Sequence, residues 1–307
     1  MGHLMTSIAI SGATSMLGIA TVNACIEHGI NVIAIVRKNS QNISRMPKSN
    51  LINVIECNLD DLKAIKTDLK CDTFIHFAWS GANHEGRSNV DMQSHNIQYA
   101  IDAVELAHKM GCNKFIGAGS QAEYGPKYGD NADYSTENPN TAYGLAKRVA
   151  GKLTRMRCDQ LDMIHVWTRI FSTFGYNDTP ESMIMYAIRS MIDGSCGHYS
   201  NARQQWDYLF ADDAGEMFYS LAQKAKKSTM VPIASGVHKA LKDFIYDIRD
   251  TINPDAELTF EDNAEDLPGL SADITNLTNI IGDAKITPFK DGIKIILDKM
   301  RKSGDAL

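Results

Sequence analysis

The sequence predicts an α/β protein with a doubly wound, mostly parallel sheet and a smaller C-terminal α/β part. Short apolar runs alternate with helical segments, and the first run passes through a Gly-rich turn into a helix. A chain of 307 residues is long for one minimal domain. We expect residues 1–175, with 205–235 returning to them, to form the larger domain, and residues 176–204 and 236–307 to form the smaller one.

Composition excludes several classes of partner. The formal net charge of −6 argues against a nucleic-acid polymer. No apolar run reaches the roughly 18 residues of a membrane span, and the start has no basic-then-apolar leader. We therefore expect a cytoplasmic protein without a membrane partner. The six cysteines lack C-x-x-C spacing and the nine histidines show no H-E-x-x-H, so no metal site is expected.

A Gly-rich turn follows the first expected strand, residues 7–11. Gly12-Ala13-Thr14-Ser15-Met16-Leu17-Gly18 opens a helix that ends near Gly29. Small residues let the backbone approach a pyrophosphate, and the helix N-terminus presents free N–H groups and a positive dipole end. The pattern indicates a dinucleotide site; the alternative is a tight turn that binds no ligand.

The second expected strand, residues 31–36, ends in Arg37-Lys38. At this point of a dinucleotide site an acidic residue bonds the free ribose 2′-hydroxyl, whereas arginine accommodates a 2′-phosphate. Two cations and no acid favour NADP(H) as cofactor. The alternative is a pair of solvated surface cations.

Three further strands are expected at residues 51–56, 72–77 and 114–118, with helices at 60–69 and 90–110. Phe77-Ala78-Trp79 ends the fourth strand at the carboxyl edge of the sheet, where cofactors lie in doubly wound folds. The loop from Trp79 through Ser80 to Asn83 is expected to border the substrate.

Tyr143 and Lys147 lie four residues apart, so a helix projects them from one face. An ammonium near the Tyr143 hydroxyl favours the phenolate, which makes the tyrosine a usable proton donor and acceptor near neutral pH. Ser120 follows the fifth strand and can hydrogen-bond a substrate oxygen. The same spacing occurs in amphipathic surface helices, and the Gly-rich turn and Ser120 favour the catalytic interpretation.

The remaining elements are shorter and more separated by loops, which is typical of a small lid-like domain. Asp212-Asp213 is expected to cap one of the helices. The elements are a strand at 162–168, a helix at 180–192, a helix at 214–226, a strand at 230–234, a helix at 239–251, a strand at 257–260 and a helix at 288–302.

Together these motifs resemble the extended short-chain dehydrogenase/reductase family, in particular its NAD(P)-dependent nucleotide-sugar epimerase/dehydratase branch, which has a Rossmann fold. Residues 12–18 resemble T-G-x-x-G-x-x-G, with Ser15 in place of the middle glycine, and residues 169–175 resemble R-x-F-N-x-x-G. Ser120 precedes Tyr124-Gly125 by four residues, as the family's catalytic serine or threonine does. Trp206 stands where the family has an arginine that binds phosphate, and Arg203 is expected to substitute.

The resemblance implies a role for each of these positions. The catalytic set is Ser120, Tyr143 and Lys147. The cofactor-binding set is Gly12, Thr14, Ser15, Met16, Leu17, Gly18, Arg37, Lys38, Asn58, Leu59, Phe77, Ala78, Trp79, Tyr143, Lys147, Ile170 and Phe171. The substrate-binding set is Ser80, Ser120, Gln121, Ser172, Arg203 and Trp206.

The absence of acid/base residues at two positions after Ser120 narrows the choice among the family's reactions. The family's 4,6-dehydratases have Asp-Glu after the catalytic residue, where this chain has Gln121-Ala122, and neither can act as an acid or base. The 3,5-epimerase/reductases have a cysteine at Ala122. The 4-epimerases usually have an acid after the second strand, where Arg37 stands. We therefore expect an NADPH-dependent reductase that acts at C4 of a 4-keto-6-deoxy sugar nucleotide.

Other functions stay open at this point. They are a nucleotide-sugar epimerase with tightly bound NAD(P), a reductase of a non-nucleotide carbonyl compound, and a non-catalytic NADP-binding regulator. The long helices at 90–110 and from Tyr143 to Cys158 suggest a homodimer of the family type.

Overall fold

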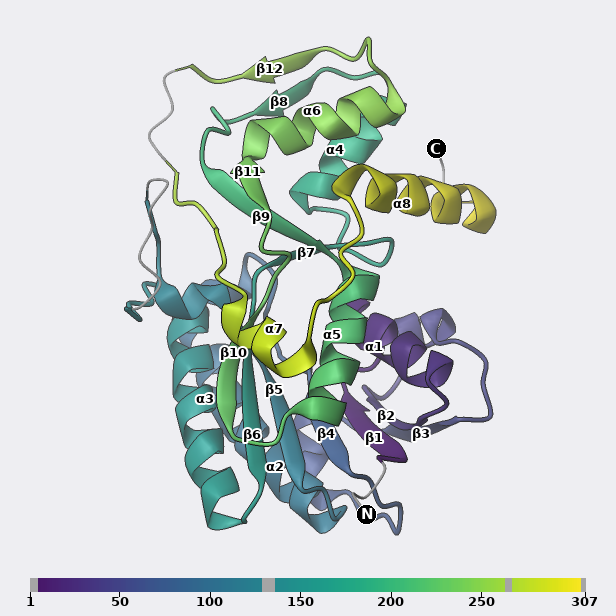
Figure 1. The fold of residues 1–307 in the computed structure, drawn as a ribbon, viewed down its shortest axis with the longest axis vertical. Coiled ribbons are helices and arrows are strands. Elements are labelled where there is room, and N and C mark those ends of the chain that lie inside the picture. The colour runs from purple at the N-terminus through teal and green to yellow at the C-terminus, as the bar shows by residue number, and fades with distance from the viewer. Residues whose placement is uncertain (1–4, 129–135, 263–266, 305–307) are drawn as a thin grey trace.

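The structure is a computed structural model that describes residues 5–128, 136–262 and 267–304. It confirms the doubly wound α/β fold (Figure 1). Seven parallel strands form the main sheet, in the order β10-β6-β5-β4-β1-β2-β3. Their bounds are β1 (Ser7–Ser11), β2 (Asn31–Val36), β3 (Ile52–Glu56), β4 (Thr73–His76), β5 (Lys114–Ser120), β6 (Ile164–Ile170) and β10 (Thr229–Ile233).

The strand order reverses at β1, which pairs with β2 on one side and with β4 on the other. From β1 the chain adds β2 and β3 toward one edge of the sheet. It then returns to the other side of β1 and adds β4, β5 and β6 toward the opposite edge. This reversal opens a crevice at the carboxyl ends of the strands, where doubly wound folds bind their ligands.

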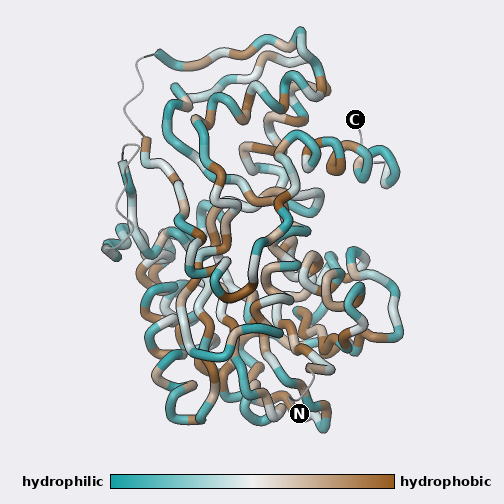
Figure 2. Tube along the Cα trace, viewed as in Figure 1, coloured by the Kyte–Doolittle hydropathy of each residue, from teal (hydrophilic) through white to brown (hydrophobic). Residues whose placement is uncertain are grey.

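Helices cover both faces of the sheet, and their apolar residues form two hydrophobic clusters with it. Figure 2 shows hydrophobic residues concentrated along the strands and on the helix faces that pack against them. One face carries α1 (Met16–Glu27), α5 (Ala211–Lys224) and α7 (Thr275–Ile281), and the other carries α2 (Val90–Lys109) and α3 (Ala142–Gln160). In the described part of the chain, the connections contain the 3-10 turns η1 (Gln41–Arg45), η2 (Leu59–Ala64), η3 (Gly86–Ser88) and η4 (Gln121–Tyr124).

A smaller part of the chain lies beyond the carboxyl edge of the sheet, at the top of Figure 1. It has its own buried cluster, which includes Phe174, Ile188, Phe210, Ile245 and Ile296. It contains a three-stranded sheet in the order β11-β9-β7 and a two-stranded sheet of β8 and β12. The bounds are β7 (Ser172–Phe174), α4 (Met183–Ile192), β8 (Gly197–Tyr199), β9 (Gln205–Phe210), β11 (His238–Ala240), α6 (Leu241–Ile252), β12 (Leu258–Phe260) and α8 (Phe289–Ser303).

Several predicted elements differ in extent. The helix expected at 60–69 is the shorter 3-10 turn η2. The strand expected from residue 162 begins at Ile164, because Asp162 has a positive φ of 54° that ends the preceding turn. The fifth strand continues to Ser120, which pairs with Ile170. Helix α7 has no counterpart among the predicted elements.

The predicted cap of α5 was wrong. Asp212 and Asp213 lie inside the first turn of α5, and Phe210 occupies the N-cap without a side-chain bond. Asp213 instead accepts hydrogen bonds from the backbone N–H and the hydroxyl of Thr287, at 2.6 and 2.8 Å. The carboxylate therefore connects α5 to the segment that leads into α8.

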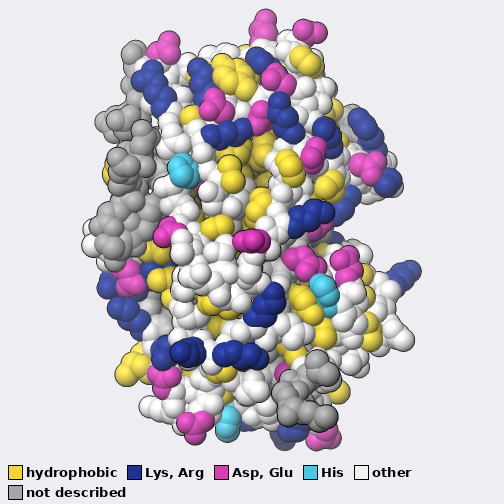
Figure 3. Space-filling model, in the orientation of Figure 1, with side chains coloured by type: hydrophobic (Ala, Val, Ile, Leu, Met, Phe, Trp, Pro, Cys, Tyr) yellow, Lys and Arg dark blue, Asp and Glu magenta, His cyan; other side chains and the backbone are white. Residues whose placement is uncertain are grey.

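Charge is mixed on the surface. Figure 3 shows Lys and Arg side chains interspersed with Asp and Glu over the face in view. Within the described ranges, no helix has the length and apolar character needed to cross a membrane.

Candidate functional site

Two adjoining cavities follow the carboxyl edge of the main sheet. A cavity of about 820 Å³ begins at the β1–α1 turn, and one of about 540 Å³ contains Ser120, Tyr143 and Lys147. We call them the turn cavity and the serine cavity. Both are lined by Ser15, Phe77, Trp79 and Ala82, so they form one elongated site.

The β1–α1 turn fits a pyrophosphate. Gly12 has a φ of +72°, and a Cβ there would meet the backbone nitrogen of Ala78 at 2.7 Å. A Cβ on Gly18 would meet the carbonyl oxygen of Gly12 at 2.3 Å, so glycine is required at both positions. Ser15 caps α1 by accepting from the Gly18 N–H at 3.1 Å, and no acid lies in the first turn. The positive end of the helix dipole therefore faces the cavity without a competing carboxylate.

Residues that follow β2 and β3 line the far end of the turn cavity. Arg37, Asn58 and Leu59 line it as the sequence suggested, and Asp60 lies beside them. Lys38 does not line it and instead pairs with Asp61 at 3.0 Å on the surface.

The other residues of the cofactor-binding set are divided between the two cavities. Thr14 and Ala78 line the turn cavity, and Met16, Leu17, Ile170 and Phe171 line the serine cavity. Ser80, expected beside the substrate, lines the turn cavity. Its backbone N–H donates to Asn96 Oδ1 at 2.8 Å, and this bond fixes the loop after β4.

Ser120, Tyr143 and Lys147 are all buried and line the same cavity. Thr141 starts α3 by accepting from the Gly144 N–H at 3.0 Å, so Tyr143 and Lys147 share the helix face that covers the end of β5. Tyr143 and Ser120 are joined by a side-chain hydrogen bond. Lys147 Nζ donates to the Ala118 carbonyl at 2.6 Å and lies 3.6 Å from the centre of the Trp79 ring.

Burial and neighbouring charges shift the pKa values of this group. Burial raises the pKa of Tyr143, and the cation that most strongly opposes this is Arg87. The pKa of Lys147 is lowered to about 7, because burial disfavours its charged form and Arg87 repels it. Burial therefore dominates the pKa of Tyr143, and the expected tuning of Tyr143 by Lys147 remains a prediction.

Arg87, which sequence reasoning missed, lies in η3 with its guanidinium carbon 4.9 Å from the centre of the Tyr143 ring. No local motif marks this position, because it reaches the tyrosine only through the fold. The spacing of Ser120 and Glu123, by contrast, is that of a capping box and could have been read from the sequence.

Glu123 holds the backbone of Ser120 in place through hydrogen bonds. Its carboxylate accepts from the Ser120 N–H at 2.8 Å, from Trp167 Nε1 at 2.9 Å and from Arg169 Nε at 3.0 Å. Burial raises the pKa of Glu123, and the charge of Arg169 acts against this shift. Arg169 also pairs with Glu137, so the backbone of Ser120 is anchored to β6 and to the loop before α3.

Gln121, Ser172 and Trp206, which are expected to bind the substrate, line the serine cavity. Arg203 is exposed and does not line the cavity, so it does not replace the family's arginine there. Residues that the sequence did not single out also line this cavity: Asp178, Met183 and Tyr208. Among the described residues no group of His, Cys, Asp or Glu could hold a metal ion.

Comparison with known proteins places the chain in a family. Residues 8–234 match the family described as NAD dependent epimerase/dehydratase. CDP-abequose synthase of Salmonella typhimurium is 24% identical over 269 residues, which cover 85% of this chain and 86% of that protein. The dTDP-4-dehydro-6-deoxyglucose reductase of Escherichia coli is 22% identical over 253 residues, which cover 79% of each chain.

Solved structures agree with the fold. The UDP-N-acetylglucosamine 4-epimerase from Methanobrevibacter ruminantium M1, in complex with UDP-N-acetylmuramic acid, superposes with a TM-score of 0.83 at 19% identity. The superposition covers 97% of this chain and all of that one. Because the family match spans most of the sequence, the chain belongs to the NAD dependent epimerase/dehydratase family and is a nicotinamide-dependent enzyme of that family.

Proposed function

We propose that this protein uses NADPH to reduce the C4 keto group of a nucleotide-linked 4-keto-6-deoxy sugar. The observation that carries the proposal is a serine cavity that combines Ser120, Tyr143 and Lys147 with Gln121, while Ala122 follows in η4. These residues can deliver one proton and hold one oxygen. Neither residue after Ser120 can exchange a further proton for dehydration or for epimerisation at C3 and C5.

The bound nicotinamide would supply a hydride to C4 of the sugar. Tyr143 would donate its hydroxyl proton to the C4 oxygen as negative charge develops there, and the Ser120 hydroxyl would hold that oxygen by a hydrogen bond. Lys147 would bind the nicotinamide ribose. Trp79 and Phe171, beside the reacting group, would exclude water from it.

The cofactor assignment rests on the turn cavity. Arg37 lines this cavity near Asn58 and Asp60, and it is the permanently charged side chain that a 2′-phosphate would meet there. Lys38 contributes less, because Asp61 neutralises it at the surface. We propose NADP(H) on this basis.

The names of two relatives agree with the substrate class. One of them is a reductase of a 4-dehydro-6-deoxyglucose linked to dTDP, and the other is a synthase of a CDP-linked sugar. Both belong to nucleotide-sugar chemistry, and one is named for the proposed type of reduction. We propose the same substrate class here, without a choice of base or of configuration at C4.

Isotope transfer tests the reaction. The enzyme is incubated with a panel of 4-keto-6-deoxy sugar nucleotides and NADPH deuterated at nicotinamide C4, and the product sugar is examined by NMR. We expect net oxidation of NADPH and deuterium at C4 of the sugar, with C3 and C5 unchanged. No transfer to any member of the panel would contradict the proposal.

The second candidate is a nucleotide-sugar 4-epimerase, which the fold of the Methanobrevibacter enzyme favours. Such an enzyme would keep NAD(P) tightly bound and would interconvert 4-hydroxy sugars without net loss of NADPH. The same experiment separates the two functions, because only the reductase consumes NADPH in proportion to product.

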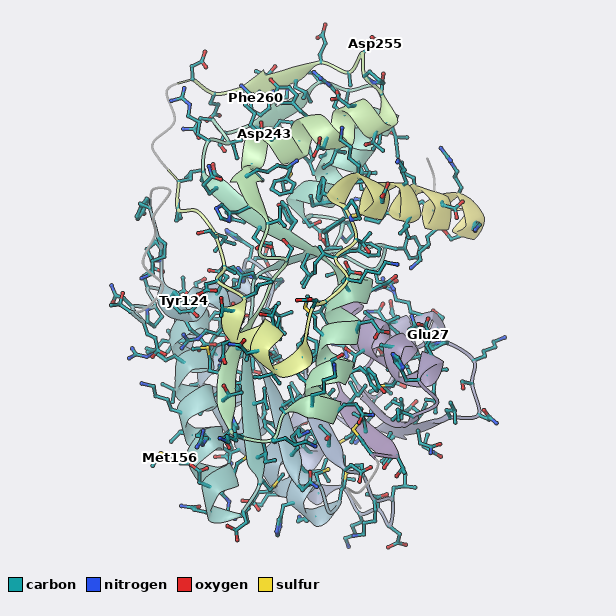
Figure 4. All side chains as sticks on the ribbon, viewed as in Figure 1. Glu27, Tyr124, Met156, Asp243, Asp255 and Phe260 are labelled. Carbon is teal, nitrogen blue, oxygen red and sulfur yellow. The ribbon has the colours of Figure 1, made fainter. Side chains whose placement is uncertain are left out.

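We also propose a homodimer formed through α3. Leu145, Val149, Leu153 and Met156 make an apolar stripe on this helix, and three of them are exposed: Leu145 at 51%, Leu153 at 39% and Met156 at 61%. Figure 4 shows Met156 on the outer side of α3. Light scattering should find a dimer that Leu153→Glu converts to a monomer, whereas a monomeric parent protein would contradict this proposal.

A further inference from the structure

The loop between β4 and α2 is held rigidly above the serine cavity. Gln93 is almost completely buried, and its amide donates to the carbonyls of Gly81 at 2.8 Å and Gly86 at 2.9 Å. Gly81 has a φ of +66°, and a Cβ on Gly86 would meet the Gly81 Cα at 2.3 Å. This close approach of two glycines sets the position of η3, which carries Arg87.

Gln93 also connects this loop to the catalytic group. Its side-chain oxygen accepts from the indole N–H of Trp79 at 2.8 Å. The Trp79 ring in turn lies edge-on to Tyr143, with centroids 6.2 Å apart, and covers the Lys147 amine. Gln93 therefore fixes both Trp79, which contacts Lys147, and the turn η3, which brings Arg87 to Tyr143.

The charged group of Arg87 lies closer to the Tyr143 ring than the Lys147 amine does. The Arg87 Nε donates to the Ala82 carbonyl at 2.9 Å, and the guanidinium carbon lies 4.9 Å from the Tyr143 ring centre. The Lys147 amine is farther from that ring, at 5.7 Å, and is bonded to Ala118. An arginine stays protonated throughout the working pH range, whereas a buried lysine readily loses its charge.

We propose that Arg87 stabilises the phenolate of Tyr143 once the tyrosine has given its proton to the substrate, and so makes Tyr143 a stronger acid. This role rests on the proposed reduction: the proton leaves Tyr143 Oη for the C4 oxygen, and the negative charge left on the ring faces the guanidinium. Arg87 acts through Tyr143 and is therefore a positioning residue. Water returns the proton to the phenolate after product leaves.

The other groups around Tyr143 cannot replace this charge. Ser120, from β5, is neutral and offers a hydrogen bond. Glu123, from η4, is acidic and raises the pKa of the tyrosine. Lys147, on α3 with Tyr143, has its pKa lowered by burial and by Arg87, so it holds its positive charge less firmly than an arginine does. Arg87 also repels the Lys147 ammonium, so its removal should raise the pKa of both side chains.

The test titrates Tyr143 itself. Fluorotyrosine is placed at position 143 alone, and its fluorine NMR signal is followed against pH in the parent chain and in Arg87→Ala, Arg87→Gln and Arg87→Lys. We expect Ala and Gln to raise the pKa by about one unit, the lower end of the range for a neighbouring opposite charge because Arg87 is exposed to solvent. Lys should restore most of the shift. Arg301→Ala, on the exposed face of α8, is the matched control and should change nothing.

An unchanged titration in Arg87→Ala, or equal shifts in the Lys and Ala variants, would overturn the proposal. High salt should reduce the difference between the parent chain and Arg87→Ala, because Arg87 is exposed, and a salt-independent shift would point to altered packing and count against it. The titration requires no substrate. A shift of the expected size in a protein that reduces no 4-keto sugar would refute the proposed function and leave standing only the stabilisation of the Tyr143 phenolate by Arg87.

Discussion

The pKa of Tyr143 is shifted by burial and by Arg87, which is distant in sequence, more than by Lys147, which lies four residues along the same helix. Burial raises the pKa of Tyr143 and lowers that of Lys147 to about 7, so both neighbours are pushed toward their neutral forms. The Tyr-x-x-x-Lys spacing predicted that these side chains share a face. It could not predict their charge states, because these depend on solvent exclusion and on Arg87, which arrives from another part of the chain.

Tyr143→Phe should reduce turnover by about 10²–10⁴-fold, the usual contribution of general acid catalysis. Binding of NADPH, measured by fluorescence or calorimetry, should survive, because the variant keeps the ring and loses only the hydroxyl. Tyr128→Phe, at a residue that is 59% exposed and lines neither cavity, is the control. Near-normal turnover in Tyr143→Phe would remove the tyrosine from the proposed mechanism.

Arg37→Asp should reverse the cofactor preference from NADPH to NADH, because a carboxylate bonds the free ribose hydroxyls and repels a 2′-phosphate. Dissociation constants for both cofactors give the measurement. Lys38→Ala should have little effect, since Lys38 already pairs with Asp61 outside the turn cavity. Equal affinity for the two cofactors, unchanged by Arg37→Asp, would contradict the assignment of NADP(H).

His165 should make the free energy of unfolding depend on pH between about 4 and 6.5. Burial lowers its pKa to about 4, from 6.5 in the unfolded chain, so between these values the unfolded state binds more protons than the folded state. The unfolding free energy should therefore fall as the pH drops below about 6.5, with a contribution from this residue of up to about 1.4 kcal/mol per pH unit. His165→Phe should flatten the profile measured by urea denaturation. Parallel profiles for the two proteins would contradict this origin.

At the scale of elements, alternation of apolar runs and helical segments located every strand of the main sheet. Strands such as β2 and β5 are buried after or throughout their first residue and, beyond a polar first residue, contain mostly continuous apolar or small residues, which can be recognised in the sequence. The pattern located β12 but missed β9 and the three-residue strands β7, β8 and β11, which pair with distant partners. It also failed at strand ends, where a single turn conformation such as that of Asp162 decides the boundary.

The crossing of α1 and α5 depends on one glycine. A Cβ on Gly215 would meet the backbone carbon and oxygen of Ala20, both at 2.5 Å. Gly215→Ala should therefore lower the unfolding free energy by about 1–3 kcal/mol through overpacking, despite a gain of about 1 kcal/mol in helix propensity. Ser220→Ala, at a partly exposed position of the same helix, should not destabilise the protein. A more stable Gly215→Ala variant would show that the helices separate freely.

At the scale of the whole molecule, the site lies where the main sheet meets the smaller part. Ser120 and Tyr143 come from the sheet side, whereas Met183 and Tyr208 come from α4 and β9. The sequence predicted that the chain would cross between the two parts and return, and β10 does rejoin the main sheet after β9 and α5. We propose that these parts are the two domains that boundaries at 175, 205 and 235 predict, although β7 and β9 pair within the smaller part and α7 packs on the main sheet. Sequence reasoning expected Arg203 in the serine cavity, which it does not line, and did not identify Asp178, since side-chain direction at this junction depends on how the two parts pack.

The late return of β10 also bears on how the protein is made. Until residue 233 has left the ribosome, β6 is the edge of the growing sheet, and its hydrogen-bonding groups are open to any other extended chain. The segment 176–228 is synthesised during that interval, before the strand that closes the edge exists. A nascent chain stalled in this window should bind chaperones or aggregate, and one released after residue 233 should be protected by its own last strand of the main sheet.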